Sequence, residues 1–206
     1  MEEEKDKRIK IALSVSLDEL EKHENNINPA HRADHTQRVF NLCKEILTYH
    51  KEADDEIVLI AAAFHDIGRS KKEGKHEIWS EEIAKEKIEN NSILRYINEE
   101  KKRLILKIVK NHAKSDNEVD DELKNSLEFK ILVDADRIDG FGPIGIIRAS
   151  LDERFQKSAK EQLDHIRDKY DVDNYKLNSN GGQIVGGKYK TYLYEFERIY
   201  KEQEYI

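Results

Sequence analysis

Several residue types are scarce in this chain of 206 residues, and each scarcity removes a class of structure. Cys43 is the one cysteine, so the chain can form no intramolecular disulfide and no zinc site built from cysteine ligands. Two prolines and nine glycines are few for this length, which argues against a fold rich in strands and tight turns. Any bound metal must therefore rest on histidines and carboxylates.

Long apolar runs and an excess of positive charge are missing as well. No stretch approaches the roughly 18 apolar residues that a membrane span needs, and the charged N-terminal segment lacks the apolar core of a secretion signal. We therefore expect no membrane partner and a cytoplasmic location. The net charge of -7 comes from 43 acidic and 36 basic residues, which argues against a long nucleic-acid surface but leaves room for a local basic pocket.

The residues that are abundant favour helices. Hydrophobic residues make up 37% of the chain, enough to bury a core, and Lys, Glu, Leu, Ile and Ala are common. Apolar residues recur at helical spacing in eight segments, which predict helices at about 7–23, 34–49, 54–64, 77–90, 99–112, 120–134, 152–168 and 191–200. We expect loops at the Gly/Pro cluster 139–145 and, as a flexible turn, at 178–188. With no repeat and no dividing linker, residues 1–206 should form one all-α domain.

His65 and Asp66 form the most informative pair in the sequence. They follow the apolar run 57–64, whose residues are hydrophobic on every side and predict a buried helix. A carboxylate at the end of such a helix is costly to bury without a cation or hydrogen bonds. Adjacent side chains on a helix point about 100° apart, so the two residues would need ligands from other helices to hold a metal.

A distant group of carboxylates could supply such a ligand. Asp134, Asp136 and Asp139 stand at the end of an apolar run and just before the Gly/Pro cluster. Their spacing alone does not choose among the three, and a solvated helix end explains them equally well. His23, His50 and His165 have no distinctive context and are interpreted as structural residues.

Three stretches together resemble the signatures of the HD-domain superfamily of metal-dependent phosphohydrolases. They are His35-Thr36-Gln37-Arg38-Val39, then Ala63-Phe64-His65-Asp66-Ile67-Gly68-Arg69, then Asp134-Ala135-Asp136-Arg137-Ile138-Asp139. Their order and separations also match. The continuation through 142–148 is similar to the small HD proteins of the YedJ type, and the likeness covers about residues 28–200.

The resemblance implies an all-α helical bundle with a metal site between its core helices. The HD-domain core would span about 28–150, with C-terminal helices at about 151–206 packed on it. One divalent cation would be held by His35, His65, Asp66 and Asp136. Imidazole and carboxylate ligands suit Mn, Fe, Zn, Co or Ni, with Mg less favoured.

Further residues are assigned to the site by their positions. The resemblance implies that His76 and His112 bind either a second metal or the substrate phosphate. Asp66 could accept the proton of a metal-bound water, and Arg69 is the best placed cation to assist catalysis. His31, which is four residues before His35, is predicted to bind substrate together with three cations, namely Lys72, Arg137 and Arg148.

The predicted function is hydrolysis of a phosphomonoester or phosphodiester in a small phosphorylated molecule, with a nucleotide as one candidate. Two alternatives remain open: a di-iron HD-type oxygenase, and a ligand-sensing module that keeps the metal but does not turn over substrate. Five aromatic residues near the C-terminus could pack on the core, as we expect from their helical spacing, or on a second subunit of a homo-oligomer. They are Tyr189, Tyr192, Tyr194, Phe196 and Tyr200.

Overall fold

The computed structural model describes residues 2–71, 75–115, 117–151, 158, 161 and 176–204. Within this part the chain is all-α and has no strand, as the sequence predicts. Its α-helices are α1 (Glu2–Lys22), α2 (Ala33–Leu47), α3 (Asp55–Phe64), α4 (His76–Asn90), α5 (Glu99–Asn111), α6 (Asp121–Asn125), α7 (Leu127–Asp139), α8 (Gly142–Ser150) and α10 (Asn180–Glu204). Short 3-10 turns lie at η1 (Glu24–Asn26), η2 (Pro29–His31), η3 (Ile67–Ser70) and η4 (Leu94–Tyr96). None of the helices described is long and apolar enough to cross a membrane.

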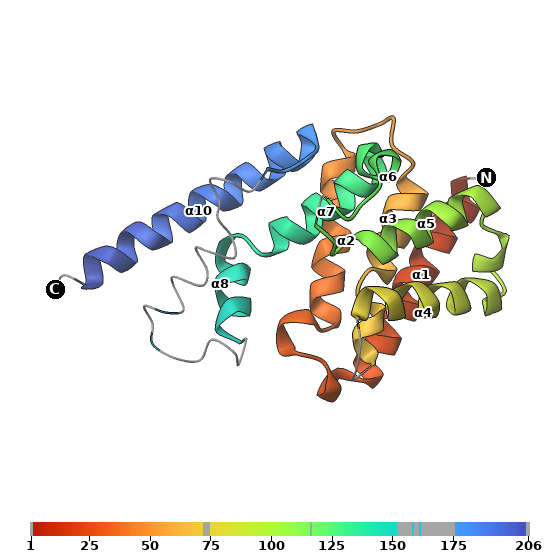
Figure 1. Cartoon of the computed structure of the whole chain (residues 1–206), viewed down its shortest axis with the longest axis horizontal. Helices are drawn as coiled ribbons and strands as arrows, with labels where there is room; N and C mark the ends of the chain where they lie inside the picture. Colours follow the sequence, from red (N-terminus) through yellow and green to blue (C-terminus); the bar gives the residue numbers. More distant parts are fainter. Residues whose placement is uncertain are drawn as a thin grey trace.

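Helix α3 lies at the centre of the bundle, in contact with α1, α2, α5 and α7 (Figure 1). Every residue from 56 to 64 is buried, so the prediction of a buried helix is confirmed. Asp54 caps the helix by accepting hydrogen bonds from the backbone amides of Glu56 and Ile57. Because α3 is covered on all sides, its C-terminal end, which carries His65 and Asp66, opens inside the bundle rather than on a free surface.

Glu56 is a buried charge that ties three helices together. Its carboxylate lies 2.5 Å from Arg8 Nε on α1 and 2.7 Å from Lys101 Nζ on α5. A buried carboxylate is tolerated when cations compensate it in this way. The pairing fixes α1 and α5 against the N-terminal turn of α3, far from the end that carries the histidine.

The structure corrects the sequence-based helix boundaries in the second half of the chain. The helix expected at 120–134 is two helices, separated at Ser126, whose hydroxyl caps α7 by accepting from the amide of Phe129. Helix α7 then continues to Asp139, so the three aspartates lie inside it. The expected loop at 139–145 includes the start of α8, where Pro143 occupies the first turn, a position that proline favours. The helix expected at 152–168 falls almost entirely outside the described residues.

Helix α10 begins at Asn180, so the expectation of a flexible turn at 178–188 is wrong. The buried carboxylate of Asp134 accepts hydrogen bonds from the backbone amides of Asn178 and Ser179, both at 2.7 Å, and from the Ser179 hydroxyl. His50 Nε2 accepts from the amide of Gly181 at 2.9 Å, which gives this histidine a structural role. The glycines allow close approach rather than flexibility.

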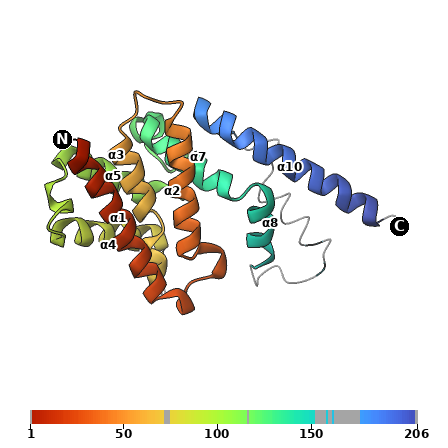
Figure 2. The same cartoon turned by 180° about the vertical axis from the view of Figure 1, so that it is seen from behind.

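The same helix extends away from the bundle beyond its contacts with α2, α7 and α8 (Figures 1 and 2). The expected core packing of its aromatic residues is only partly correct. Tyr189 is half-buried against the core, whereas Tyr192 and Tyr194 are 47% and 46% exposed. The inward-facing residue of this turn is Leu193.

Replacing Gly182 with alanine is expected to destabilise the protein by about 1 to 3 kcal/mol, because overpacking strains a well-packed site. A Cβ at this position would lie 2.3 Å from Asp134 Oδ2. Gly187 provides the control, since a Cβ there meets nothing within 4 Å, and Gly187→Ala should stabilise the helix by about 0.5 to 1 kcal/mol. Urea unfolding measures both changes, and two shifts of the same sign would contradict the packing described here.

Candidate metal centre

Five histidines and two aspartates converge where the ends of several helices meet. Each histidine lies in the first or last turn of a helix or 3-10 helix, or directly after its end, and Asp136 lies in the last turn of α7. The imidazoles form a continuous series in which neighbouring ring centroids are 5.2 to 5.5 Å apart, in the order His31, His35, His65, His112 and His76. The structure therefore brings together the four metal ligands predicted from the sequence, together with His31, His76 and His112.

The backbone conformation at His65 and Asp66 explains how these adjacent side chains can face residues from several helices. His65 keeps helical backbone angles, whereas Asp66, at φ -110° and ψ 9°, leaves the helix and starts η3. Gly68 lets η3 lie directly on α4, because a Cβ there would come within 2.2 Å of the His76 carbonyl oxygen and 2.4 Å of the Ser80 amide nitrogen. This close approach brings His76 to Asp66, so Gly68 acts through contact rather than as a left-handed helix cap.

Hydrogen bonds to Nδ1 fix which ring nitrogen faces the centre. His65 Nδ1 lies 2.8 Å from the Ala62 carbonyl, and His112 Nδ1 lies 2.7 Å from the Val109 carbonyl. A carbonyl oxygen only accepts, so both Nδ1 atoms carry hydrogen and donate it. His35 Nδ1 donates in the same way to Asp139 Oδ2 at 2.8 Å. All three rings therefore turn Nε2 inward. Metal-binding histidines are held in the same way, by a carbonyl or carboxylate that accepts from the other ring nitrogen.

The first group of side chains that could hold a metal ion, called the first metal site below, comprises the four predicted ligands His35, His65, Asp66 and Asp136. His35 Nε2 lies 3.3 Å from His65 Nε2, 3.3 Å from Asp136 Oδ1 and 3.5 Å from Asp66 Oδ2. Atoms that share one cation at about 2.1 Å lie roughly 3 to 3.5 Å from one another. The spacing of these four side chains therefore fits a divalent cation, and their chemistry suits the first-row transition metals named above.

The second group that could hold a metal ion, called the second metal site below, comprises Asp66, His76 and His112. Asp66 Oδ1 is buried and has no hydrogen-bond partner among the described residues. It faces His76 Nε2 at 3.3 Å and His112 Nε2 at 3.6 Å. Because an unpaired buried carboxylate oxygen is costly, this atom fits a cation held with the two imidazoles. The two oxygens of Asp66 thus face two different groups of histidines.

The charge states of the histidines differ across the centre. Burial lowers the pKa of His65 to about 4, and the pKa of His31 likewise to about 4, so both rings are neutral at pH 7. Burial opposes protonation of His35 and His112 too, but the nearby carboxylates outweigh it and raise the pKa of each ring. Without metal, protons on His35 and His112 therefore compensate the buried aspartates.

Metal affinity is expected to rise with pH between about 6 and 8, because a cation must displace those protons. The sign is set by the raised pKa of both rings: their protons stabilise the metal-free fold below about pH 6.5, and this stabilisation is lost as the pH rises. Each proton released makes the affinity about tenfold stronger per pH unit. Titration with Mn²⁺ in buffers of different ionisation enthalpy counts the protons. His112→Gln should release one fewer, and an affinity independent of pH would contradict the expectation.

Asp139 orients His35 by accepting a hydrogen bond from the ring nitrogen that points away from the first metal site. In addition to His35, its carboxylate accepts from Arg38 Nε at 2.7 Å and from Arg148 Nη1 at 2.6 Å. Spacing alone left the roles of the three aspartates open, and the family resemblance chose Asp136. Asp136 faces His35 Nε2, Asp139 orients His35, and Asp134 anchors α10. Arg38 was not predicted, although its spacing of four residues from Asp34, with which it pairs at 2.6 Å, points to the face of α2 that it uses.

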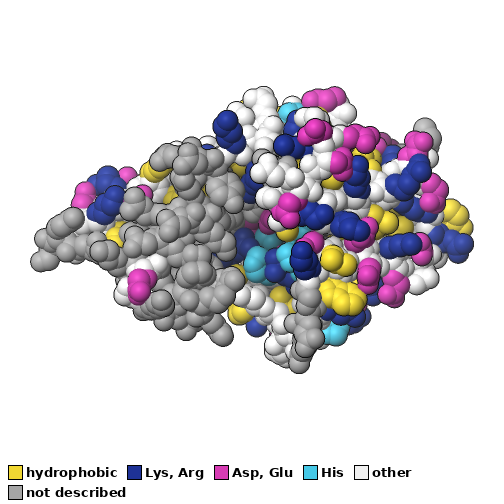
Figure 3. Space-filling model, viewed as in Figure 1, with side chains coloured by type: hydrophobic (Ala, Val, Ile, Leu, Met, Phe, Trp, Pro, Cys, Tyr) yellow, Lys and Arg dark blue, Asp and Glu magenta, His cyan; other side chains and the backbone are white. Residues whose placement is uncertain are grey.

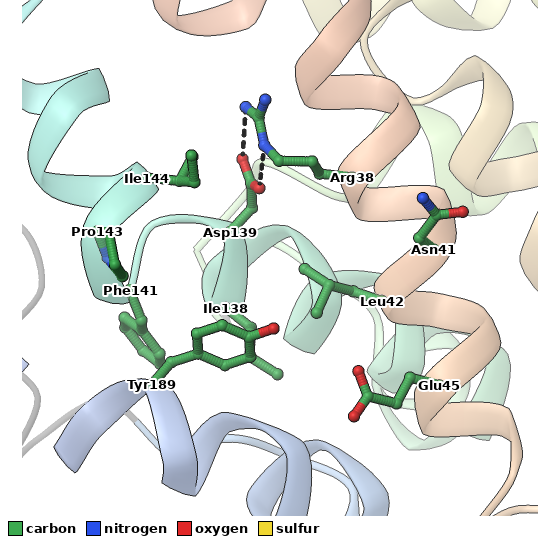
Figure 4. A pocket seen from close by; sticks show the side chains of 10 residues that line it. All are labelled: Arg38, Asn41, Leu42, Glu45, Ile138, Asp139, Phe141, Pro143, Ile144 and Tyr189. Carbon is green, nitrogen blue, oxygen red and sulfur yellow. Dashed lines mark hydrogen bonds and ion pairs between the residues drawn. The ribbon is translucent and has the colours of Figure 1, made fainter. Parts of the chain in front are cut away.

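Arg38 and Asp139 also line a pocket of about 210 Å³ between α2, α8 and α10 (Figure 4). Figure 4 shows Phe141 and Tyr189 at the end nearest α10, with the ion pair at the opposite end. The pocket is lined mainly by apolar side chains. Asp139 therefore lies between the metal centre and this mainly apolar pocket.

The predicted substrate-binding residues occupy different positions. Arg69 Nε donates to Asp66 Oδ2 at 2.5 Å while its side chain stays 25% exposed, and the His31 side chain is 22% exposed. Arg148 is almost fully buried and also donates to the Ala30 carbonyl, which favours a positioning role over substrate contact. Lys72 lies outside the described residues. Figure 3 shows histidine side chains near the middle of one face, with Lys and Arg side chains beside them.

Comparison with known proteins gives one family match and several structures of similar fold. A family model described as HD domain matches residues 32–140, whereas none of the curated proteins matches. The Lin1889 protein from Listeria innocua is 22% identical, with a TM-score of 0.70 over 98% of both chains. An HD-superfamily hydrolase from Bacillus thuringiensis is 21% identical, with a TM-score of 0.69 over 97% of this chain and 98% of its own. YpgQ from Bacillus subtilis in complex with ADP is 18% identical, with a TM-score of 0.69 over 97% of this chain and 96% of its own.

Proposed function

Since the chain belongs to the HD domain family, we propose that it is a metal-dependent phosphohydrolase, a phosphomonoesterase or phosphodiesterase that acts on a small phosphorylated molecule. Structural neighbours described as HD-superfamily hydrolases support the broader class of hydrolase. The observation that carries the proposal is the position of Asp66, whose two oxygens face two separate groups of inward-turned histidines.

The chain's own side chains supply the proposed ligands and, in Arg69, one partly exposed guanidinium. Asp66 is ionised, because burial raises its pKa less than Arg69 and His65 lower it, and its pKa stays well below the ordinary value. Such a weak base serves better as a ligand than as the proton acceptor suggested by the sequence. A divalent cation bound at these residues would supply an activated water and neutralise charge on phosphoryl oxygens.

Arg69 is the best candidate for contact with the substrate. It compensates Asp66 and lies 3.3 Å from His76 Nε2, at the partly exposed edge of the centre. A guanidinium in this position can donate to two oxygens of a phosphoryl group. His31, whose Nδ1 also lies near Asp66 Oδ2, at 3.3 Å, remains neutral and can donate or accept a single hydrogen bond with the substrate.

A substrate screen tests the proposal directly. The full chain is incubated with nucleotides, sugar phosphates, p-nitrophenyl phosphate and bis(p-nitrophenyl) phosphate, each with Mn²⁺, Co²⁺, Ni²⁺ or Mg²⁺, and phosphate or nitrophenol release is measured. We expect turnover that requires added metal and stops with a chelator. The absence of turnover throughout would favour a ligand-sensing module. Turnover that survives both the chelator and Asp136→Ala would place the reaction elsewhere.

The shared carboxylate of Asp66 also supports a second candidate, a di-iron oxygenase. Two adjoining sites rich in histidine suit iron as well as other transition metals. Metal analysis and an oxygen electrode separate the two candidates. Two irons per chain with oxygen consumption would favour the oxygenase, and phosphate release with Mn²⁺ or Co²⁺ under nitrogen would favour the hydrolase.

A further inference from the structure

A second hollow, of about 140 Å³, lies between the segment after α5, helix α6 and helix α7. Four cations line it: Lys114, Lys124, Lys130 and Arg137. All four are half-buried, and none of the described residues that line the hollow is acidic. We call this hollow the basic pocket. It concentrates positive charge in a chain whose net charge is -7.

Arg137 Nη1 donates to the Lys176 carbonyl oxygen at 3.2 Å, so Lys114 and Lys130 are the cations that favour an anion here. Two like charges that line one hollow repel each other, and the repulsion is stronger where water is partly excluded. The arrangement becomes favourable when an anion enters between them. The ring of Phe129 and the side chain of Val133 form the apolar part of the lining. At about 140 Å³ the pocket is well below the roughly 300 to 1,000 Å³ that holds a whole drug-sized ligand, so it suits a single anionic group.

Two segments of the chain contribute residues both to the basic pocket and to the metal centre. Lys114 follows the metal-site residue His112 by two positions. On α7, Val133 is three residues before Asp136, a spacing that puts Cβ atoms about 5 to 6 Å apart, and Arg137 is the next residue. Successive residues turn by about 100°, so the stripe that carries Val133 and Arg137 lies to one side of Asp136, and Asp139 with His35 lies to the other side.

We infer that the basic pocket binds a second anionic group of the substrate, so that the substrate class is small molecules with a phosphoryl group at the metal centre and another phosphate or carboxylate beside it. The inference rests on the proposed function, because it assumes that the substrate reaches the metal centre. Lys114, from the segment after α5, and Lys130, from α7, would both bind the anion.

Binding of AMP and ADP tests the inference, since the two differ by one phosphate. Dissociation constants are measured by calorimetric titration of the Mn²⁺-loaded full chain, with product formation checked at the end. ADP should bind at least about tenfold more tightly than AMP to the wild type, as expected for hydrogen bonds between charged groups. Lys114→Gln combined with Lys130→Gln should remove most of that advantage and leave AMP binding nearly unchanged.

The matched control removes the same charge elsewhere. Lys44 and Lys51 are exposed, and they border a different hollow at the C-terminal end of α2. Lys44→Gln combined with Lys51→Gln should preserve the ADP advantage. An advantage that persists in the variant lacking Lys114 and Lys130, or that is absent from the wild type, would overturn the inference.

Binding of inorganic pyrophosphate tests whether the basic pocket holds a group of the substrate or a separate free anion. If pyrophosphate binds the wild type, loses affinity in the Lys114 and Lys130 variant, and yet does not compete with ADP, the pocket takes a separate anion and the substrate assignment is wrong. Competition with ADP supports it. None of these readouts needs turnover, so a protein that hydrolyses nothing but binds ADP through the basic pocket would defeat the proposed function alone.

Discussion

Replacing His65 with alanine is expected to lower metal-dependent hydrolysis by about 1,000-fold or more, since a lost metal costs several kcal/mol of transition-state stabilisation. His65 is fully buried, neutral, and fixed by the Ala62 carbonyl with Nε2 toward the other ligands. Alanine removes that ligand and leaves no side chain that can replace it. Elemental analysis of the purified protein and Mn²⁺ titration measure the loss independently of any substrate.

His23 provides the control for this substitution. Its side chain is 42% exposed, and its Nε2 lies 3.5 Å from Glu19, away from the metal centre. His23→Ala should leave metal content and turnover unchanged. If His65→Ala retained the wild-type metal affinity, the assignment of the first metal site would be wrong, even if activity were lost for another reason.

Replacing Asp139 with alanine should cost about 3 to 5 kcal/mol of stability, because it leaves buried cations without their partner. Asp139 is buried and receives hydrogen bonds from His35, Arg38 and Arg148 at once. Burial opposes its ionisation, but the bonds from His35 and Arg38 lower its pKa to about 2. Its contribution to stability is therefore present above about pH 4 and lost as the pH falls toward 2.

The same change should weaken metal binding by about 10- to 100-fold, the usual effect of removing a partner that orients a ligand. Asp34→Asn is the matched control: Asp34 also pairs with Arg38 but is 65% exposed, and exposed pairs contribute less than about 1 kcal/mol. Urea unfolding and Mn²⁺ titration measure the two effects. Equal losses in Asp34→Asn and Asp139→Ala would show that Asp139 acts only as a surface ion pair.

The helical fold could be predicted because its signals are local. The apolar run 57–64 marks the central helix, and the HD signatures identify the family, which the family match confirms. The predictions fail where tertiary contacts determine the local structure. Nothing in the local sequence shows that Asp134 and His50 will fix the start of α10, so the glycines at 181 and 182 indicate a flexible turn. The likeness to the YedJ type stays a prediction.

The candidate site could be predicted only in part, for a related reason. Sequence order placed His35, His65, Asp66 and Asp136 together through the family resemblance, but spacing alone could not separate Asp136 from Asp139. Both face the same side of α7 within one turn, and only the position of α2 decides which of them meets His35 Nε2 and which meets Nδ1. The basic pocket is formed by lysines from three segments, and the sequence of no single segment predicts it.

The shared carboxylate of Asp66 has a thermodynamic consequence. If one ion draws on Oδ2 and a second on Oδ1, the two binding equilibria are linked, and each ion changes the affinity of the other by the same factor. As the free metal concentration rises, the two sites then fill with one coupled binding isotherm rather than with two independent isotherms. The number of metals found after purification would reflect that concentration, and the coupling factor, obtained from a full titration, would characterise the centre.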